Sequence, residues 1–513
     1  MAIIDGTEGN DRLTGGTGAD SLSGYGGNDS IYAGLGDDSL YGGLGQDVLV
    51  GEGGNDLVYG GDGNDDIYGD FGSDDSGDDT LYGDAGDDNI NGEQGSDEIY
   101  GGAGDDDISG WHGSDDIYGG AGDDLLYVYT GLSSDFHRMY GGEGNDMASF
   151  RDASGYFDGG TGDDVISISG LNSGSVALIM TGTSGTLTGS RGISASFDNT
   201  ENVQFYGGAG NHTMISAGGD DLFSDDGFGN NLVNSGDGND RVFVGVGRNE
   251  VDAGGGNDQV FYVMGEAVTL SGGSGDDTLT ISSYGAGAAL LDLRDPTAIT
   301  DGYGSVIDGF ENVIVGFSYS DDAVLLGDGA DLVYAAYGRD SVKGGGGNDT
   351  IHGQDDADRL IGQSGTDQIY GGDDDDLLRG GDDGDQLYGD KGSDWLSGGA
   401  GDDQLSGGGG ADVFRFNARS SGSVDLVRDF ASGLDRLVID TFLIDDALLR
   451  GSLSDDQLAF GTAVGPGGQF VLIDETAGRV LYWDADGNGA GQQTALLVLQ
   501  ASADLLASDI WIS

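Results

Sequence analysis

The stretch Gly60-Gly61-Asp62-Gly63-Asn64-Asp65-Asp66-Ile67-Tyr68 decides the fold, because its pattern returns every nine residues from Gly6 to Tyr127. Glycine stands first in the unit, aspartate sixth and an aliphatic residue eighth. Six glycine-rich residues can form the positive-φ turns that other residues resist, which leaves three residues for a short strand. The middle residue of that strand is expected to point inward and its two neighbours outward.

Thirteen copies of the unit occupy the first part of the chain, and ten more run from Leu326 to Arg415. The sixth positions of the first run are Asp11, Asp20, Asp29, Asp38, Asp47, Asp56, Asp65, Asp74 and, after an insertion of five residues, Asp88, Asp97, Asp106, Asp115 and Asp124. Those of the second run are Asp331, Asp340, Asp349, Asp358, Asp367, Asp376, Asp385, Asp394, Asp403 and Asp412. The insertion, around Asp75 to Asp79, is expected to bulge from one edge, and Asp79 is a further candidate for the role of the sixth position.

The unit resembles GGxGxDxUx, the calcium-binding nonapeptide of RTX proteins. The resemblance implies an all-β fold, a long right-handed parallel β-roll, in which two nonads make one coil and calcium lies between adjacent turns of one edge. The calcium ligands would be turn carbonyls and all the sixth-position carboxylates. Along one edge these carboxylates lie eighteen residues apart, as Asp38 and Asp56 do. Oxygen ligands in a turn are what a hard cation such as calcium takes. Stacked carboxylates without a cation would repel one another, so folding is expected to depend on calcium.

The composition agrees with carboxylates placed in turns. The 93 acidic residues outnumber the 18 basic ones, the formal charge is −75, and only ten of the acids are glutamate. Aspartate is the acid that turns favour. Roughly twenty calcium ions, one for each pair of same-edge turns, would cancel about half of the charge. The charge excludes nucleic acid as a partner, and no apolar run reaches the roughly 20 residues of a membrane span.

Between residues 128 and 325 the unit is degenerate, although six aspartates keep sixth positions and remain candidate calcium ligands: Asp146, Asp164, Asp221, Asp240, Asp258 and Asp277. His212 stands at another sixth position, and we interpret it as a lost calcium site rather than a transition-metal ligand. Two similar blocks each begin Gly-Gly-x-Gly-Asp-Asp and end in Glu-Asn-Val, at Glu201 and Glu311. They are predicted to be wider coils that continue the roll, with longer strands at Val176–Met180 and Ala288–Leu293.

From residue 413 onward the repeats stop and apolar alternation takes over, as in Val424–Phe430 and Phe470–Ile473. This part resembles the C-terminal module of serralysin-type RTX proteins in Asp425–Phe430, Gly433–Leu437 and Tyr482–Gly489. The resemblance implies a β-rich cap and a type I secretion signal, whose partner is the type I secretion machinery; the ending Asp509–Ser513 is typical of such a signal. The start of the sequence lacks the basic and apolar regions of a signal peptide. We therefore expect a bacterial protein that is exported without one, to the outside or to the cell surface.

These features predict four regions: a β-roll at 1–127, a degenerate roll at 128–325, a second roll at 326–412, and a cap with the secretion signal at 413–513. No motif indicates an enzyme, since HExxH and GxSxG are both absent. The predicted function is a secreted calcium-binding structural protein, of a surface layer, filament or extracellular matrix, that folds on binding calcium. Self-association is expected through the first coil, which carries Asp11 and Asp20.

Two other functions stay open. Ninth-position tyrosines eighteen residues apart, such as Tyr41 and Tyr59 or Tyr370 and Tyr388, predict outward ladders. Aromatic packing between strands explains such ladders, but a docking surface for a cell-surface glycan would make the protein an adhesin or carbohydrate-binding protein. A membrane-active RTX protein is the second alternative, and it would need an amphipathic segment of a length that this sequence does not show.

Overall fold

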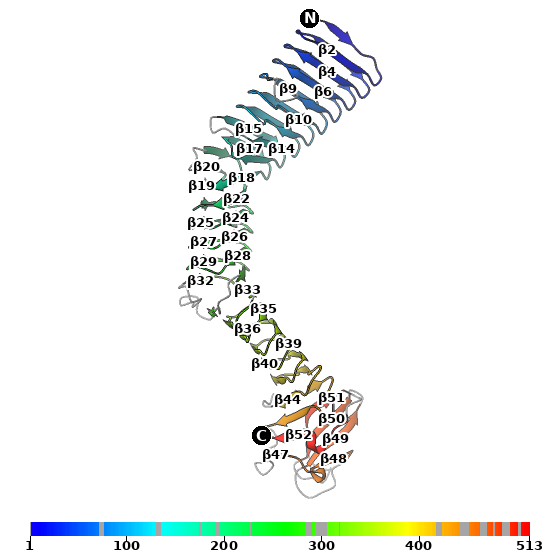
Figure 1. Ribbon diagram of the computed structural model, residues 1–513, viewed down its shortest axis with the longest axis vertical. Coiled ribbons are helices and arrows are strands. Elements are labelled where there is room, and N and C mark those ends of the chain that lie inside the picture. Colours follow the sequence, from blue (N-terminus) through cyan, green and yellow to red (C-terminus); the bar gives the residue numbers. More distant parts are fainter. Residues whose placement is uncertain are drawn as a thin grey trace. The chain divides into compact units, whose positions relative to one another are not determined.

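Short strands that pair in parallel with a strand one coil away make up most of the chain (Figure 1). The structure is a computed structural model of the 513 residues. It describes residues 2–70, 76–129, 135–173, 176–189, 194–225, 227–283, 290–293, 305–317, 319–416, 423–440, 451–461, 469–475, 478–484, 493–500 and 504–513. The chain divides into two compact units, the first comprising Met1–Val260 and Thr269–Gly275 and the second Phe261–Val268 and Asp276–Ser513.

The first unit has two sheets, which the chain visits alternately. Sheet 1 contains β1 Ile3–Asp5, β3 Ser21–Gly26, β5 Ser39–Leu44, β7 Leu57–Asp62, β9 Thr80–Ala85, β11 Glu98–Ala103, β13 Asp116–Ala121, β15 Phe136–Glu143, β17 Ser154–Thr161, β19 Val176–Thr181, β20 Ser184–Gly189, β21 Ser194–Asp198, β23 Thr213–Ile215, β25 Leu232–Asn234, β27 Glu250–Asp252 and β29 Thr269–Ser271. Sheet 2 contains β2 Arg12–Gly16, β4 Ser30–Leu35, β6 Val48–Gly53, β8 Asp66–Tyr68, β10 Asn89–Asn91, β12 Asp107–Ser109, β14 Leu125–Tyr129, β16 Met147–Arg151, β18 Val165–Ser173, β22 Asn202–Ala209, β24 Leu222–Asp225 and β26 Arg241–Val244. The boundary between the two units falls within β28 Gln259–Val263.

The second unit is built in the same way. Sheet 3 contains β31 Leu290–Asp292, β34 Ala323–Leu325, β36 Ser341–Gly346, β38 Arg359–Ser364, β40 Leu377–Asp382, β42 Trp395–Ala400, β44 Val413–Phe416, β46 Arg436–Ile439, β52 Ile510–Ile512 and β47 Gly451–Ser452. Sheet 4 contains β30 Thr278–Ser282, β33 Asn312–Gly316, β35 Leu332–Tyr337, β37 Thr350–Asp355, β39 Gln368–Asp373, β41 Gln386–Lys391, β43 Gln404–Ser406, β45 Asp425–Val427, β51 Gln493–Leu499, β50 Gly478–Asp484, β49 Gln469–Glu475 and β48 Leu458–Phe460. The remaining elements are β32 Val306–Asp308 and the 3₁₀ turns η1 Asp455–Gln457 and η2 Ala507–Asp509.

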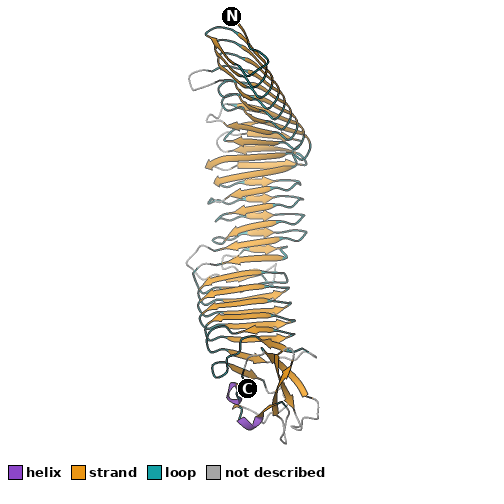
Figure 2. Ribbon diagram, turned by 90° about the vertical axis from the view of Figure 1, so that its right-hand side faces the viewer, coloured by secondary structure: helices purple, strands orange, loops and turns teal. Residues whose placement is uncertain are grey.

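The register of these sheets is the one that the nine-residue period predicts. In sheet 1, Leu40 pairs with Val58, and Tyr41 with Tyr59, one coil of eighteen residues apart. Both eighth-position residues are fully buried, whereas Tyr41 is exposed. Each coil therefore contributes one aliphatic side chain from each sheet to a narrow core, and Figure 2 shows the strands stacked as successive rungs within each unit. The all-β parallel solenoid is thus confirmed.

The predicted strand at Val176–Met180 is present as β19, but its pairing differs from a simple wider coil. β19 pairs antiparallel with β20, and β20 pairs antiparallel with β21. The two residues Gly182 and Thr183 make the turn between β19 and β20, and Gly182 has a φ of +64°. A two-residue loop with glycine at a positive φ closes a hairpin, so this segment is a hairpin inserted between parallel coils. Of the second expected long strand, Leu290–Asp292 is present as β31, while residues 288 and 289 lie outside the described residues.

The C-terminal segments of apolar alternation form strands, as a β-rich module implies: Val424–Phe430 contains β45, and Phe470–Ile473 belongs to β49. Two later strands return to the solenoid: β52 pairs with β46 in parallel, and β51 pairs with β45. β49, β50 and β51 form an antiparallel extension of sheet 4. In the described parts of the chain, no helix is both long enough and apolar enough to cross a membrane.

Candidate metal centre

The sixth-position aspartates form rows along the edges of the coils. In each row, the backbone N–H of one aspartate donates a hydrogen bond to Oδ1 of the aspartate one coil further along the chain, as Asp38 does to Asp56 at 2.7 Å. Before sheet 1 the row is Asp20, Asp38, Asp56, Asp79, Asp97 and Asp115. Before sheet 2 it is Asp11, Asp29, Asp47, Asp65, Asp88, Asp106, Asp124, Asp146 and Asp164, and later Asp221, Asp240 and Asp258.

The second unit repeats this arrangement. Before sheet 3 the row is Asp322, Asp340, Asp358, Asp376, Asp394, Asp412 and Asp435. Before sheet 4 it is Asp331, Asp349, Asp367, Asp385, Asp403 and Asp425. Asp277 lies at the start of β30 and donates its N–H to Glu311 Oε2 at 2.9 Å. Every predicted sixth-position aspartate that the structure describes thus lies in one of these turns, while Asp74 lies outside the described residues.

The second carboxylate oxygen, Oδ2, is what distinguishes these aspartates from ordinary turn residues. It is buried and accepts no hydrogen bond from any described residue in Asp29, Asp38, Asp47, Asp56, Asp65, Asp79, Asp88, Asp97, Asp106, Asp124, Asp146, Asp164, Asp340, Asp349, Asp358, Asp367, Asp376, Asp385 and Asp394. A buried carboxylate oxygen without a partner costs free energy, and a bound cation removes that cost.

The first glycine of each unit makes room beside this oxygen. A Cβ atom built on Gly42 would lie 2.5 Å from Asp47 Oδ2 and 2.5 Å from the carbonyl oxygen of Gly60, one coil further along. Oxygens from two successive coils therefore converge on one point, which only glycine leaves open. The turn also needs a positive φ at its second position, for example 112° at Gly43.

Burial sets the electrostatics of these rows. It raises the pKa of Asp97 to about 9, and the hydrogen bond from the Asp79 backbone N–H offsets only part of that rise. Burial likewise raises the pKa of Asp56 and of Asp376 to about 8, and neighbouring carboxylates add to the rise in both cases. Burial and neighbouring carboxylates therefore both disfavour the ionised form of these aspartates, and a bound cation would favour it.

The structure corrects the position of the inserted loop. The Asp56 N–H donates to Asp79 Oδ1 at 2.8 Å, and the Asp79 N–H donates to Asp97, so Asp79 occupies the row and the extra residues precede it. The sequence carries the reason, because Leu81 follows Asp79 at the spacing of the buried eighth position and is fully buried. No aliphatic residue stands two places after Asp74.

The rows also run past the predicted end of the repeats at Asp412. Asp425 accepts the Asp403 N–H at 3.2 Å, and Asp435 accepts the Asp412 N–H at 3.0 Å. Asp322 begins the row before sheet 3. Sequence reasoning missed these three because their turns lack the glycine pattern, although each has a buried aliphatic residue two places later.

Two glutamates fill row positions in the degenerate part. Glu201 Oε2 accepts the Asp164 N–H at 3.0 Å, as Glu311 accepts that of Asp277. Both belong to the Glu-Asn-Val triplets, in which the valine falls on the eighth position and is buried. The repeated triplets were visible in the sequence, and the spacing from acid to valine was the signal that identifies their role.

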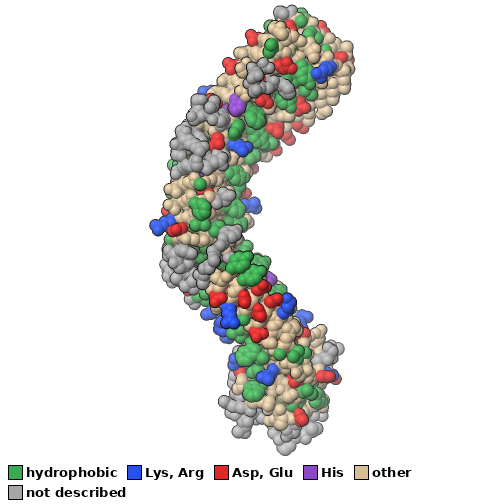
Figure 3. Space-filling view, in the orientation of Figure 1, with side chains coloured by type: hydrophobic (Ala, Val, Ile, Leu, Met, Phe, Trp, Pro, Cys, Tyr) green, Lys and Arg blue, Asp and Glu red, His purple; other side chains and the backbone are tan. Residues whose placement is uncertain are grey.

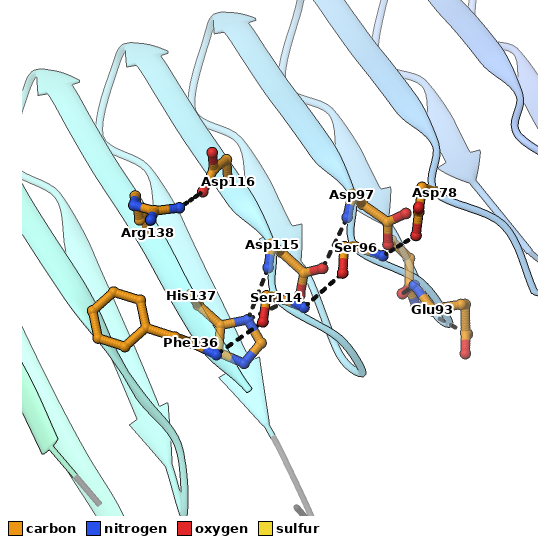
Figure 4. A network of polar contacts seen from close by, with 11 residues as sticks. Asp78, Glu93, Ser96, Asp97, Ser114, Asp115, Asp116, Phe136, His137 and Arg138 are labelled. Atoms are coloured by element: carbon orange, nitrogen blue, oxygen red, sulfur yellow. Dashed lines mark hydrogen bonds and ion pairs between the residues drawn. The ribbon is translucent and has the colours of Figure 1, made fainter. Parts of the chain in front are cut away.

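Histidine and asparagine replace the acid at four other row positions. His137 follows Asp115 in the row, and its Nδ1 lies 3.0 Å from Asp115 Oδ2, with both side chains fully buried (Figure 4). His212 does stand in a row, as predicted, and its Nε2 lies 2.9 Å from the Gly208 carbonyl oxygen. Next to it, Asn231 Oδ1 accepts the His212 N–H, and Asn249 Oδ1 accepts that of Asn231. These turns keep the backbone hydrogen bond of the row but lose the carboxylate.

Taken together, the donor set fits calcium. In the described residues, no three Asp, Glu or His side chains gather at one point as a compact metal cluster. Each gap between coils instead pairs an unpartnered carboxylate oxygen with turn carbonyls, as at Asp47 and Gly60. Hard oxygen donors with no nitrogen or sulfur are the ligands of calcium, and flexible turns suit its irregular coordination.

Comparison with known proteins gives one result. The chain matches the family described as RTX calcium-binding nonapeptide repeat (4 copies) over residues 5–40, 41–75, 75–99, 92–126, 225–260, 265–280, 326–360, 352–387 and 379–414. No curated protein matches the chain as a whole. The matched segments cover just over half of the sequence and contain the aspartates with an unpartnered Oδ2 named above, apart from Asp146 and Asp164. The chain therefore belongs to the family of RTX calcium-binding nonapeptide repeat proteins.

Proposed function

We propose that this calcium-binding repeat protein is a structural component of the bacterial cell surface or extracellular matrix, whose folding is switched on by calcium outside the cell. The observation that carries the proposal is the set of buried Oδ2 atoms without hydrogen-bond partners, repeated in almost every coil of the nonad arrays. A protein whose stability is spread evenly over identical turns suits a mechanical or scaffolding role.

The residues that would hold calcium are the row aspartates and the carbonyls of the first glycines. Between the coils of Asp47 and Asp65, the donors would be Asp47 Oδ2 and the Gly60 carbonyl oxygen, while Asp65 Oδ1 fixes the turn by accepting the Asp47 N–H at 2.7 Å. Bound calcium supplies the positive charge that lets neighbouring carboxylates stack in ionised form.

Circular dichroism with and without calcium tests the proposal. We expect a disordered chain in excess chelator and β-structure in millimolar calcium, with site affinities of roughly 10⁻⁴ to 10⁻³ M, the range of extracellular modules. Asp47→Asn should remove one site, whereas Asp62→Asn, at an exposed turn position, should not. Full β-structure and protease resistance in chelator would contradict the proposal.

Export by type I secretion is part of the same proposal. Residues 451–513 contain β51 and β52, which pair with β45 and β46 in the last coils of the solenoid. The same segment carries the C-terminal residues that resemble the serralysin-type secretion signal. Deleting residues 451–513 should leave the protein inside the cell. A secretion assay in a host with the matching transporter decides this, and normal extracellular yield of the truncated chain would refute it.

Self-association in calcium completes the proposal. Among the described strands, β1 pairs with β3 alone, and a strand with one free side can recruit another chain. Sedimentation in millimolar calcium should show a concentration-dependent increase in size that Asp11→Ala with Asp20→Ala abolishes. A single monomer boundary at all concentrations would exclude this contact.

The tyrosine ladders do not favour the adhesin alternative. Tyr59, Tyr82, Tyr100 and Tyr118 form a stack with ring centroids 4.7 to 4.8 Å apart and planes within 8°. Their ring faces lie against one another, so the ladder offers ring edges and hydroxyls to solvent rather than the flat faces on which sugars stack. These ladders therefore stabilise neighbouring strands.

A further inference from the structure

The outer face of sheet 3 is basic in a strongly acidic protein. We define the sheet 3 face as the outward side chains that flank the buried central residue of each strand from β34 to β46. It carries five cations, Lys343, Arg359, Arg379, Arg415 and Arg436, and no acid. The chain has only 18 basic residues against 93 acids, so five on one face without an acid is a marked local reversal of charge. In Figure 3 several Lys and Arg side chains lie over the strands from β36 onward, with Asp and Glu side chains between them in the same view.

Two of these cations have no carboxylate partner. Arg359 and Arg379 are exposed and form no ion pair with any described residue. Two exposed cations elsewhere do pair, Arg138 with Asp116 at 2.9 Å and Lys391 with Asp373 at 2.6 Å. Carboxylates are abundant in this chain, so an acid-free surround for Arg359 and Arg379 leaves both guanidinium groups available to an external anion.

Arg415 is only partly neutralised. One of its terminal nitrogens lies 3.3 Å from Asp440, but its Nε is buried and has no hydrogen-bond partner among the described residues. Arg359, Arg379 and Arg415 line one groove of about 210 Å³, together with Ile361, Leu377 and Trp395. Trp395 is 42% exposed and has no aromatic partner among the described residues, in contrast to the stacked tyrosines.

The cations repeat at a fixed interval along the face. Lys343, Ile361, Arg379 and Ser397 are successive cross-strand neighbours. Arg415 continues this line, because Leu396 pairs with Phe414 in the same parallel register, so a cation stands on every second strand. Two strand spacings amount to about 9.6 Å, which is close to the length of an extended disaccharide. A polymer with one anion on every second sugar would match this interval without bending.

From these observations we propose that the sheet 3 face binds an extended polysaccharide that carries a carboxylate on every second sugar. Lys343, Arg379 and Arg415, which share this interval, take successive carboxylates, and Arg359 on the neighbouring line adds positive charge beside Arg379. The exposed ring of Trp395, on the strand between those of Arg379 and Arg415, stacks on the intervening sugar. Apolar Ile361 and Leu377 form the floor of the groove. This binding activity goes beyond the proposed structural role. It rests on the proposed function only because the sheet 3 face forms when the second unit folds.

Binding of hyaluronan oligosaccharides to the calcium-loaded full-length protein tests the proposal, since hyaluronan carries its carboxylate on every second sugar. Isothermal titration calorimetry should detect binding that weakens as salt is added, and no binding of neutral dextran of equal length. Arg359→Gln with Arg379→Gln should weaken hyaluronan binding about tenfold or more, and Trp395→Ala should also weaken it. Arg138→Gln is the control for the loss of one arginine charge outside the face, because Arg138 lies on sheet 1, and it should leave the affinity unchanged.

Calcium-dependent circular dichroism of each variant shows whether it folds, which separates failure of this proposal from failure of the proposed function. Folded wild-type protein that does not bind hyaluronan, or binds neutral dextran equally well, overturns the inference. Equal weakening by Arg138→Gln also overturns it, because attraction would then be unspecific. If the double variant disperses a wild-type oligomer in the absence of any saccharide, the face is a contact between copies of the chain, and the polysaccharide assignment is wrong.

Discussion

Removing calcium at neutral pH should unfold the chain, and acid should restore its β-structure without any metal. In the metal-free fold, burial raises the pKa of Asp97 to about 9 and that of Asp376 to about 8, from an ordinary value of 3.8. A raised pKa means that the folded chain binds the proton more tightly than the unfolded chain does. The stability that goes with these groups is therefore complete below pH 3.8 and is lost as the pH rises through the folded-state pKa values.

The size of the effect follows from the shifts. At pH 7 the solution lies about three pH units above the pKa of Asp97 in the unfolded chain. Folding without calcium forces Asp97 to bind a proton at this pH, which costs about 4 kcal/mol at roughly 1.4 kcal/mol per unit. Burial also raises the pKa of Asp65, Asp106 and Asp349 to about 7. A few such groups are enough to cancel the 5 to 15 kcal/mol by which a typical domain is stable.

Far-UV circular dichroism of calcium-stripped protein between pH 7 and pH 4 measures this, with light scattering to detect aggregation near the pI of about 4.1. We expect a disordered spectrum at pH 7 and a gain of β-signal on acidification. In saturating calcium the trend should reverse, because protons compete with the metal for the same carboxylates. The reasoning fails if metal-free protein keeps its β-signal at pH 7, or if soluble protein gains none by pH 4.

Three further substitutions probe single features of the rows. Gly42→Ala places a methyl group where two oxygens converge, so calorimetric titration should count one calcium site fewer, whereas Gly18→Ala, with nothing within 4 Å, should keep the full number. His137→Asp restores a carboxylate opposite Asp115 and should add calcium capacity, measured in the same titration; an unchanged count would show that this gap is closed for another reason. Ile117→Ala empties a fully buried core position and should destabilise the calcium-bound fold by about 2 to 5 kcal/mol in urea unfolding, and a change below 1 kcal/mol would contradict the assignment of the core.

The nonad period was enough to predict the parallel solenoid, the buried eighth position and the rows of aspartates. The prediction from the period succeeds because each unit must place glycine in a positive-φ turn and has only three residues for a strand. Few other backbone conformations fit this pattern. The register of Leu40 with Val58 follows from the period alone.

The period was less informative where glycine is scarce. His137, Asn231 and Asn249 hold row positions through backbone hydrogen bonds, which any side chain with an acceptor atom can make, so residue type does not mark them. A common signal was nevertheless present, since each stands two places before a buried apolar residue, as Asn231 does before Val233. The hairpin of β19 and β20 was not predicted, because the pattern of its strands does not distinguish a hairpin from a wider coil.

The hydrogen bonds that the row aspartates accept through their side chains run in one direction along the described rows. The N–H of Asp38 needs Asp56, and that of Asp358 needs Asp376, so a turn is completed by the coil that follows it in the sequence. A coil that joins on the N-terminal side finds its acceptor already in place, whereas one that joins on the C-terminal side must bring the acceptor with it. The backbone hydrogen bonds between the same turns run the opposite way, since the Leu57 N–H donates to the Asp38 carbonyl oxygen, so a missing coil leaves an unpaired group on the neighbour at either side.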